Sequence, residues 1–170
     1  MPDWFKRLVF RALRVLSTAY AKRKVARHGV GFTVNFPCLF GSVTEIGNHC
    51  HFNGMKVRGI GRLTIGDYFH SGDEVLVLTQ NHNYRNPEML PYDHADIGRD
   101  VKIGNYVWIG SRVTLLPGAE LGDGCVVQAG AVVSGRFPAN AVIGGNPAKI
   151  FSYRDAEVVD RLVAQGRFLL

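Results

Sequence analysis

The sequence has few cysteines and no long apolar run. Its 170 residues include three cysteines, Cys38, Cys50 and Cys125, an odd number without CxxC spacing. Such cysteines are typical of buried thiols in a reducing cytoplasm and do not indicate a disulfide framework. No window reaches the roughly 18 apolar residues of a membrane-spanning helix, and no apolar segment ends in the cleavage site of a secretory signal. A single cytoplasmic domain with a sizeable core is expected.

Acidic residues are almost absent from the first 28 positions. Residues 1–28 hold eight Lys and Arg against one acid, Asp3, so this segment carries +7 while the whole chain carries +6. The remainder sums to −1, which argues against nucleic-acid binding, because a nucleic-acid-binding body carries its charge on the main fold. Apolar residues at helical spacing predict an amphipathic helix, with Asp3 as its N-cap. This helix either caps the open end of the core or lies on an anionic membrane surface.

From residue 97 onward the sequence repeats every six residues. Aliphatic residues recur without a miss at Ile97, Ile103, Ile109, Leu115, Leu121, Val127 and Val133. This repetition predicts a coil of short parallel strands, in which three hexads close a triangular turn of about 18 residues. Each hexad is expected to supply a strand of about four residues. Glycine follows several of the aliphatics, where it is expected to tolerate backbone angles that a side chain penalises.

The flanking segments complete the expected organisation. The coil is expected to occupy residues 29–150, with a looser count before residue 77 and one extra residue between positions 52 and 65. Residues 77–98 break the count and carry two of the six histidines. The tail, residues 151–170, has helical periodicity at 155–165 and is expected to fold back over the last coil.

Three motifs within the repeat resemble a known family. They are "VWIGSRVTLLPGAELGDG", "AGAVV" and the closing "GGNPAK". Over residues 40–150 the chain is similar to the hexapeptide-repeat acyltransferases, and most similar to their sugar and xenobiotic O-acetyltransferase branch. The resemblance implies an all-β fold, a left-handed parallel β-helix, with an amphipathic helix before it and a short helix after it. It also implies acetyl-CoA as acyl donor without a metal, and a homotrimer with active sites between subunits.

The resemblance selects His82 as the catalytic residue. Members of the family place a histidine at the start of a loop thrown out of the β-helix, and "TQNHN" matches that place, with the loop at residues 81–96. An imidazole with a pKa near 6.5 can take a proton from the attacking hydroxyl or amine at neutral pH. The acetyl group is expected to pass directly to the acceptor, and the sequence has no GxSxG elbow. His94 lies in the same loop, but no family motif selects it.

The resemblance also assigns binding residues. A backbone amide at Gly110–Ser111 is expected to stabilise the oxyanion. The residues expected to contact acetyl-CoA are Trp108, Gly110, Ser111, Ala129, Gly130, Ser134, Arg136 and Lys149. The residues expected to contact the acceptor are Asn53, Tyr84, Met89 and Asp93.

Two departures from the family pattern bear on these assignments. Gly135 stands where the family often has a lysine, so Arg136 or Arg154 is expected to serve the CoA phosphates. The acidic pair of galactoside enzymes is absent between Asn53 and Ile65. The predicted acceptor is therefore not a simple galactoside. The basic helix at residues 1–28 suggests a membrane-proximal substrate, so the predicted acceptor is a sugar hydroxyl of a surface-polysaccharide precursor or of a nucleotide- or lipid-linked sugar. N-acetylation of an amino sugar and O-acetylation of a xenobiotic are the alternatives.

Two other classes of function remain open from the sequence. In a zinc carbonic anhydrase-like protein, His51 and His70 would stack one coil apart at about 4.8 Å. Zinc needs a third ligand, and the H-x4-H spacing of those anhydrases is missing. In a non-enzymatic scaffold, the β-helix would serve only to trimerise and to present the basic helix to a membrane.

Overall fold

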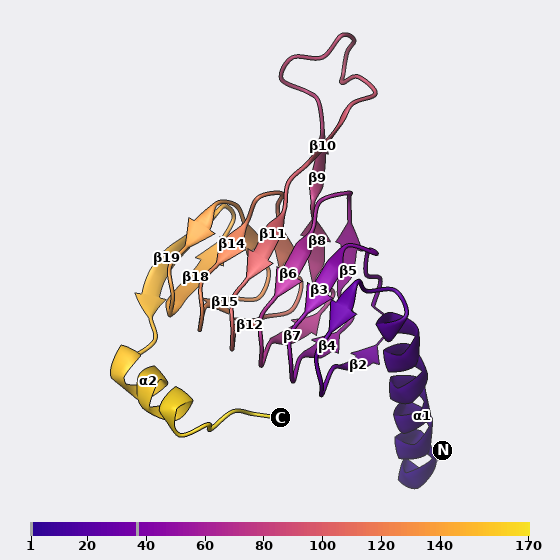
Figure 1. Cartoon of the computed structure of the whole chain (residues 1–170), viewed down its shortest axis with the longest axis vertical. Helices are drawn as coiled ribbons and strands as arrows, with labels where there is room; N and C mark the ends of the chain where they lie inside the picture. Colours follow the sequence, from indigo (N-terminus) through magenta and orange to yellow (C-terminus); the bar gives the residue numbers. More distant parts are fainter. Residues whose placement is uncertain (1, 37) are drawn as a thin grey trace.

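The computed structural model describes residues 2–36 and 38–170. Its strands form a parallel β-helix with one α-helix at each end, α1 (Asp3–Lys22) and α2 (Ala156–Ala164), as Figure 1 shows. This confirms the predicted architecture. The predicted N-cap is wrong by one residue, because Pro2 occupies that position and Asp3 lies in the first turn. The Asp3 carboxylate still favours this helix end electrostatically.

Three sheets make the sides of the coil, and their strands are parallel except for β19. The six-stranded sheet contains β1 (Arg27–His28), β3 (Thr44–Ile46), β6 (Leu63–Ile65), β11 (Val101–Ile103), β14 (Glu120–Leu121) and β17 (Arg136–Phe137). The four-stranded sheet contains β5 (Lys56–Arg58), β8 (Leu76–Leu78), β13 (Thr114–Leu115) and β16 (Val132–Val133). The seven-stranded sheet contains β2 (Thr33–Phe36), β4 (His51–Asn53), β7 (His70–Asp73), β12 (Trp108–Ile109), β15 (Val126–Val127), β18 (Ala141–Gly145) and β19 (Ala148–Tyr153).

The strand register confirms the predicted length of a coil. Lys102 pairs with Glu120, 18 residues later, and Trp108 pairs with Val126 at the same separation. The extra residue expected before residue 65 is also present, because Ile46 and Ile65 pair across 19 residues. The strands from β12 to β17 are only two residues long, shorter than the expected four, since the remaining residues of each hexad form the corner.

The repeated aliphatic positions form the core, with one exception. Six of the seven are at most 3% exposed: Ile103, Ile109, Leu115, Leu121, Val127 and Val133. Ile97 is 41% exposed, so its predicted place in this column is wrong. The three cysteines are buried and unpaired as expected, and burial raises their pKa, that of Cys50 to about 11.

The glycines that directly follow the repeated aliphatics serve a different purpose from the expected one. Gly104 and Gly110 do not have positive φ; such angles fall two residues later, at Tyr106 and Arg112. A Cβ on Gly110 would lie 2.6 Å from the backbone nitrogen of Ala129 in the next coil. Glycine is therefore required here by the close approach of successive coils.

Ile97 is exposed because it lies on a segment that leaves the coil. Ile65 pairs with Ile103 across 38 residues, which is 20 more than one coil needs. Nearly all of the surplus forms an excursion, residues 80–98, whose neck is the antiparallel pair β9 (Gln80–His82) and β10 (Asp96–Gly98). No residue of the excursion is buried. In Figure 1 it projects from one side of the coil, whereas both helices extend beyond the opposite side, near β4, β7 and β12.

The C-terminal helix was predicted to fold back over the last coil, and this prediction is wrong. β19 pairs antiparallel with β18, and α2 lies beyond this hairpin with Val159 as its buried residue. The chain then turns back along the seven-stranded sheet (Figure 1), where Phe168 stacks on Tyr68 with ring centroids 3.9 Å apart. The hairpin, rather than the helix, satisfies the open strand edge.

Candidate active site

The neck of the excursion orients His82. The β9–β10 register sets His82 opposite Asp96, and the histidine Nδ1 lies 3.3 Å from Oδ1 of the aspartate. The ring of Tyr92 stacks on the imidazole with centroids 4.0 Å apart. When Nδ1–H donates to Asp96, Nε2 is left as a proton acceptor. An imidazole held in this way by a carboxylate is chemically able to act as a general base.

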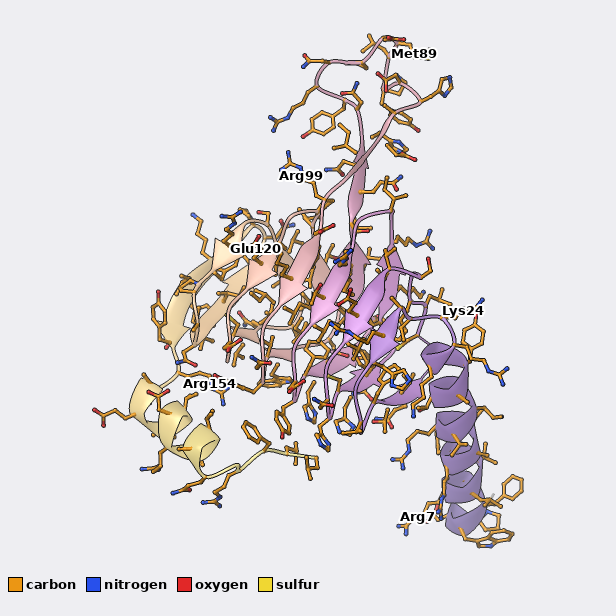
Figure 2. The ribbon with its side chains drawn as sticks, viewed as in Figure 1. Arg7, Lys24, Met89, Arg99, Glu120 and Arg154 are labelled. Atoms are coloured by element: carbon orange, nitrogen blue, oxygen red, sulfur yellow. The ribbon has the colours of Figure 1, made fainter. Side chains whose placement is uncertain are left out.

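Tyr84 and Met89 differ in their relation to His82. Tyr84 lines the same hollow as His82, about 160 Å³ in volume. Arg85 donates to the Tyr84 hydroxyl at 3.5 Å, and this bond lowers the pKa of Tyr84. Met89 lies at the outer end of the excursion (Figure 2) and does not line the hollow. Only Tyr84 of the two is therefore placed to touch a group that reacts at His82 of the same chain.

Asp93 holds the shape of the excursion. Its carboxylate accepts hydrogen bonds from the Asn83 side chain at 2.7 Å and from the backbone amides of Ala95 at 2.9 Å and Glu88 at 3.2 Å. These bonds, first that of Ala95, lower the pKa of Asp93. They tie the two limbs of the segment together, which preorganises the residues around His82.

Several residues expected to bind acetyl-CoA lie on the seven-stranded side of the coil. Trp108, Gly110, Ser111 and Ala129 line one hollow of about 450 Å³, together with Phe151. Trp108 is 57% exposed, so its indole forms an open apolar wall and does not fill the core. A groove with an aromatic wall and small residues on its floor can hold a narrow flexible chain.

The two amides expected to stabilise an oxyanion are not equivalent. The Gly110 amide donates to the carbonyl of Val127 at 2.8 Å and is therefore used by the coil. The Ser111 amide has no hydrogen-bond acceptor within residues 2–36 and 38–170. Ser111 Oγ accepts from the amide of Asp73 at 3.3 Å, which fixes its side chain. The Ser111 amide is thus the available donor of the pair.

The remaining predicted donor-site residues lie outside this hollow. Gly130 forms a corner with φ of 75°, and Ser134 is exposed after β16. Arg136 lies in the six-stranded sheet, where its Nε is 3.2 Å from Glu120 Oε2. Lys149 is exposed on β19, and it has no ion pair in the part of the chain that the structure describes. Of these two cations, Lys149 is the one free to meet a phosphate.

Asn53 lies on the same side of the coil as Trp108, away from the excursion. Its amide nitrogen donates to the carbonyl of Ser71 at 2.7 Å, and its Oδ1 accepts from Asn35 at 2.8 Å. One chain therefore places His82 on one side of the coil and Asn53 and Trp108 on the other (Figure 1). The predicted site residues are not brought together within a single chain.

The two coil histidines lie at the expected spacing, with their ring planes tilted by 32°. His51 and His70 pair in register, and their ring centroids lie 4.7 Å apart. His51 also hydrogen bonds to Thr33, and Nε2 of His70 lies 3.3 Å from the carbonyl oxygen of Leu169. Within the described residues, no group of three or more His, Cys, Asp or Glu is placed to hold a metal ion.

The sequence interpretation missed Asp96 as the partner of His82. The available signal was local, because a chain that leaves a coil and re-enters it must bring the two limbs together. Asp96 immediately precedes Ile97, where the six-residue count resumes. A carboxylate at that point was a candidate partner for the histidine at the start of the excursion.

Known proteins resemble the chain in sequence and in fold. Residues 94–135 match the family "Bacterial transferase hexapeptide (six repeats)". The chain is 34% identical over 119 residues to the "Putative lipopolysaccharide biosynthesis O-acetyl transferase WbbJ" of Escherichia coli K12, covering 66% of this chain and 58% of that protein. The chain spans about half the length of the curated relatives that it matches.

Solved structures share the fold over more of the chain. A galactoside acetyltransferase in complex with coenzyme A superimposes with a TM-score of 0.71 and 26% identity, covering 96% of this chain and 86% of that one. The hexapeptide-repeat acetyltransferase VCA0836 of Vibrio cholerae O1 biovar eltor, complexed with acetyl-coenzyme A, gives a TM-score of 0.67 and 27% identity. It covers 81% of this chain and 76% of its own.

Proposed function

Because this chain is a member of the hexapeptide-repeat acyltransferase family, we propose that it transfers the acetyl group of acetyl-CoA to a sugar hydroxyl. The observation that carries the proposal is the arrangement of His82 between Asp96 and Tyr92 at the neck of the excursion. A solvent-exposed histidine with a carboxylate on Nδ1 and a free Nε2 is suited to a general base.

The proposed reaction is a direct transfer. His82 Nε2 takes the proton of the acceptor hydroxyl as its oxygen attacks the thioester carbonyl. The Ser111 amide donates to the oxygen that becomes negative in the tetrahedral intermediate. When the carbon–sulfur bond breaks, the histidine returns the proton to the leaving CoA thiolate. Buried thiols with raised pKa supply no competing nucleophile on the protein.

A homotrimer with sites between subunits would complete this arrangement. His82 and Trp108 lie on opposite sides of one coil, so a neighbouring copy must supply one of them. We infer that the excursion of one subunit meets the seven-stranded side of the next. The donor would then lie along Trp108, Ser111 and Ala129, with Gly130, Ser134 and Lys149 near its outer end.

The proposed acceptor is a precursor of a surface polysaccharide, or a nucleotide- or lipid-linked sugar. The name of the WbbJ relative supports a polysaccharide sugar. N-acetylation of an amino sugar and O-acetylation of a xenobiotic require the same base and the same donor. Turnover of UDP-sugars, amino sugars, methyl glycosides and chloramphenicol, followed by CoA release, separates these alternatives.

Peripheral contact with an anionic membrane through α1 is part of the proposal. Leu8, Leu13 and Leu16 are each at least half exposed, and residues 1–28 carry +7. The described helices are not long and apolar enough to cross a membrane. Exposed leucines beside cations favour the lipid interface instead. Leu13→Glu/Leu16→Glu is expected to lower binding to phosphatidylglycerol vesicles by about tenfold or more, and unchanged binding contradicts this contact.

The first test of the proposed function is calorimetric titration of acetyl-CoA into the pure protein. We expect saturable binding to the wild type and to His82→Ala alike, because the base does not hold the donor. A trimer by light scattering is expected in the same sample. A folded trimer that binds no acetyl-CoA would contradict the transferase activity and favour the scaffold.

A further inference from the structure

α1 packs against the coil with its polar face. Thr18 Oγ accepts from the amide of Val34 at 3.0 Å, and Ala21 is the buried residue of the helix. Leu13 and Leu16, on the other face, are 50% and 67% exposed. This orientation is the reverse of the usual one, in which the apolar stripe faces the core. It turns the arginines of the helix toward the coil.

Three of these arginines line one hollow together with Asn53, the residue expected to contact the acceptor. Arg7, Arg11 and Arg14 line a space of about 500 Å³, together with Phe10, Asn35 and Asn53. Arg7 is seen on the coil-facing side of α1 in Figure 2. None of the three arginines forms an ion pair with a carboxylate within the described residues. The charge of Arg14 also contributes to lowering the pKa of His51 on the neighbouring strand.

Three unneutralised guanidinium groups around one hollow fit an anion with several oxygens. A guanidinium binds phosphate through two parallel hydrogen bonds, and it cannot lose its charge. A hollow of this volume is within the usual range for a small-molecule site, about 300 to 1,000 Å³. The side-chain amides of Asn35 and Asn53 add polar groups at the wall shared with the coil.

We propose that Arg7, Arg11 and Arg14 bind the diphosphate of a sugar acceptor whose sugar ring lies toward Asn53. This inference rests on the proposed function and names its substrate class: a glycosyl diphosphate, carried either by a nucleoside or by a lipid. A free sugar would leave the three charges without a partner.

The position of the hollow assigns it to the acceptor rather than to the donor. The seven-stranded sheet runs in the order β19, β18, β15, β12, β7, β4, β2. Asn53 on β4 is near one edge, whereas Ala129 follows β15 and Lys149 lies on β19 at the other edge. A donor that extends from Trp108 on β12 past Ala129 toward Lys149 leads its phosphates away from α1.

The test compares two triple variants with equal loss of charge. Arg7→Gln/Arg11→Gln/Arg14→Gln removes the hollow's cations, and Lys22→Gln/Arg23→Gln/Lys24→Gln removes three cations beyond it on the same segment. Both are exposed substitutions that spare the Thr18 and Ala21 contacts. The full chain is titrated with uridine diphosphate, farnesyl diphosphate, inorganic pyrophosphate and acetyl-CoA.

We expect a diphosphate to bind the wild type and the lysine-rich control alike, and to bind the arginine variant about tenfold or more weakly. Tighter binding of uridine diphosphate indicates a nucleotide carrier, and tighter binding of farnesyl diphosphate indicates a lipid carrier. Acetyl-CoA is expected to bind all three proteins equally.

Three results would overturn the inference. They are no diphosphate binding to the wild type, an equal loss in both variants, and a loss of acetyl-CoA binding confined to the arginine variant. The last result would assign the hollow to the donor. Failure of every protein to bind acetyl-CoA contradicts the transferase activity instead, and the diphosphate titrations still decide the anion site.

Discussion

In the coils between Val101 and Gly145, buried aliphatic side chains recur every six residues, whereas the excursion at residues 80–98 has no buried residue at all. The coils are held by packing and by strand register. The excursion is held by the carboxylate of Asp93 and by the stacking of Tyr92 on His82. Repetition therefore uses side chains for stability, and its interruption frees side chains for chemistry.

The largest expected effect concerns the chemical step, which the comparison assigns to the excursion. His82→Ala is expected to lower kcat by about 10² to 10⁴, because a positioned base contributes that much to proton transfer. His94→Ala, in the same excursion, is the matched control and should leave kcat within about twofold. Release of CoA with the best acceptor from the panel measures both. Equal losses would show that the excursion, not its base, matters.

The second prediction compares two leucines. Leu115 is fully buried in the coil, and Leu90 in the excursion is 88% exposed. Leu115→Ala should lower the free energy of unfolding by about 2 to 5 kcal/mol, because it leaves a cavity between packed coils. Leu90→Ala should change it by no more than about 0.5 kcal/mol. Denaturant unfolding at fixed protein concentration measures both. Similar losses of unfolding free energy would mean that Leu90 is packed against other residues of the protein.

The third prediction concerns the orientation of the base. Asp96→Asn keeps the size of the side chain but removes the charge next to His82 Nδ1. We expect kcat to fall roughly tenfold to a hundredfold, less than for His82→Ala, with KM for acetyl-CoA unchanged. Asp100→Asn, a nearby exposed carboxylate beyond the excursion, is the control. An unchanged kcat in Asp96→Asn would show that Asp96 does not contribute to the reaction.

The coil was predictable from sequence because its cause is periodic. Each hexad repeats the same steric requirement, so register, coil length and core positions all follow from one count. The six-residue period does not predict features that depend on the neighbouring coil. These features include the two-residue length of the strands and the close approach of the next coil to Gly110. Ile97 fits the count by spacing alone, although it belongs to the neck of the excursion.

The site was only partly predictable. His82 and Trp108 could be selected by resemblance, but the pairing of His82 with Asp96 depends on where two limbs of an excursion meet. The inward arginines of α1 could not be anticipated, because an amphipathic stripe normally indicates which face is buried. Here the exposed leucines reverse that rule, and the hydrogen bond that Thr18 accepts from the amide of Val34 holds the polar face against the coil.

The smallest expected effect concerns a histidine of the coil, His51, and the dependence of folding stability on pH. Burial, and then the nearby His70, His49 and Arg14, lower the pKa of His51 below its ordinary value of 6.5. In the unfolded chain His51 binds its proton near pH 6.5, whereas in the folded chain it does so only at lower pH. The unfolded state therefore holds more protons in this interval, and folding stability falls as pH decreases below about 6.5.

His51→Asn should remove this part of the acid sensitivity. Between about pH 7 and pH 5 the Tm of the variant is expected to fall about 1 to 3 °C less than that of the wild type, whatever its absolute Tm. Asp73 and Asp93 have lowered pKa values and titrate below this interval, so they do not obscure the difference. An equal fall of Tm in the variant and in the wild type would show that the coil does not penalise the charge of His51.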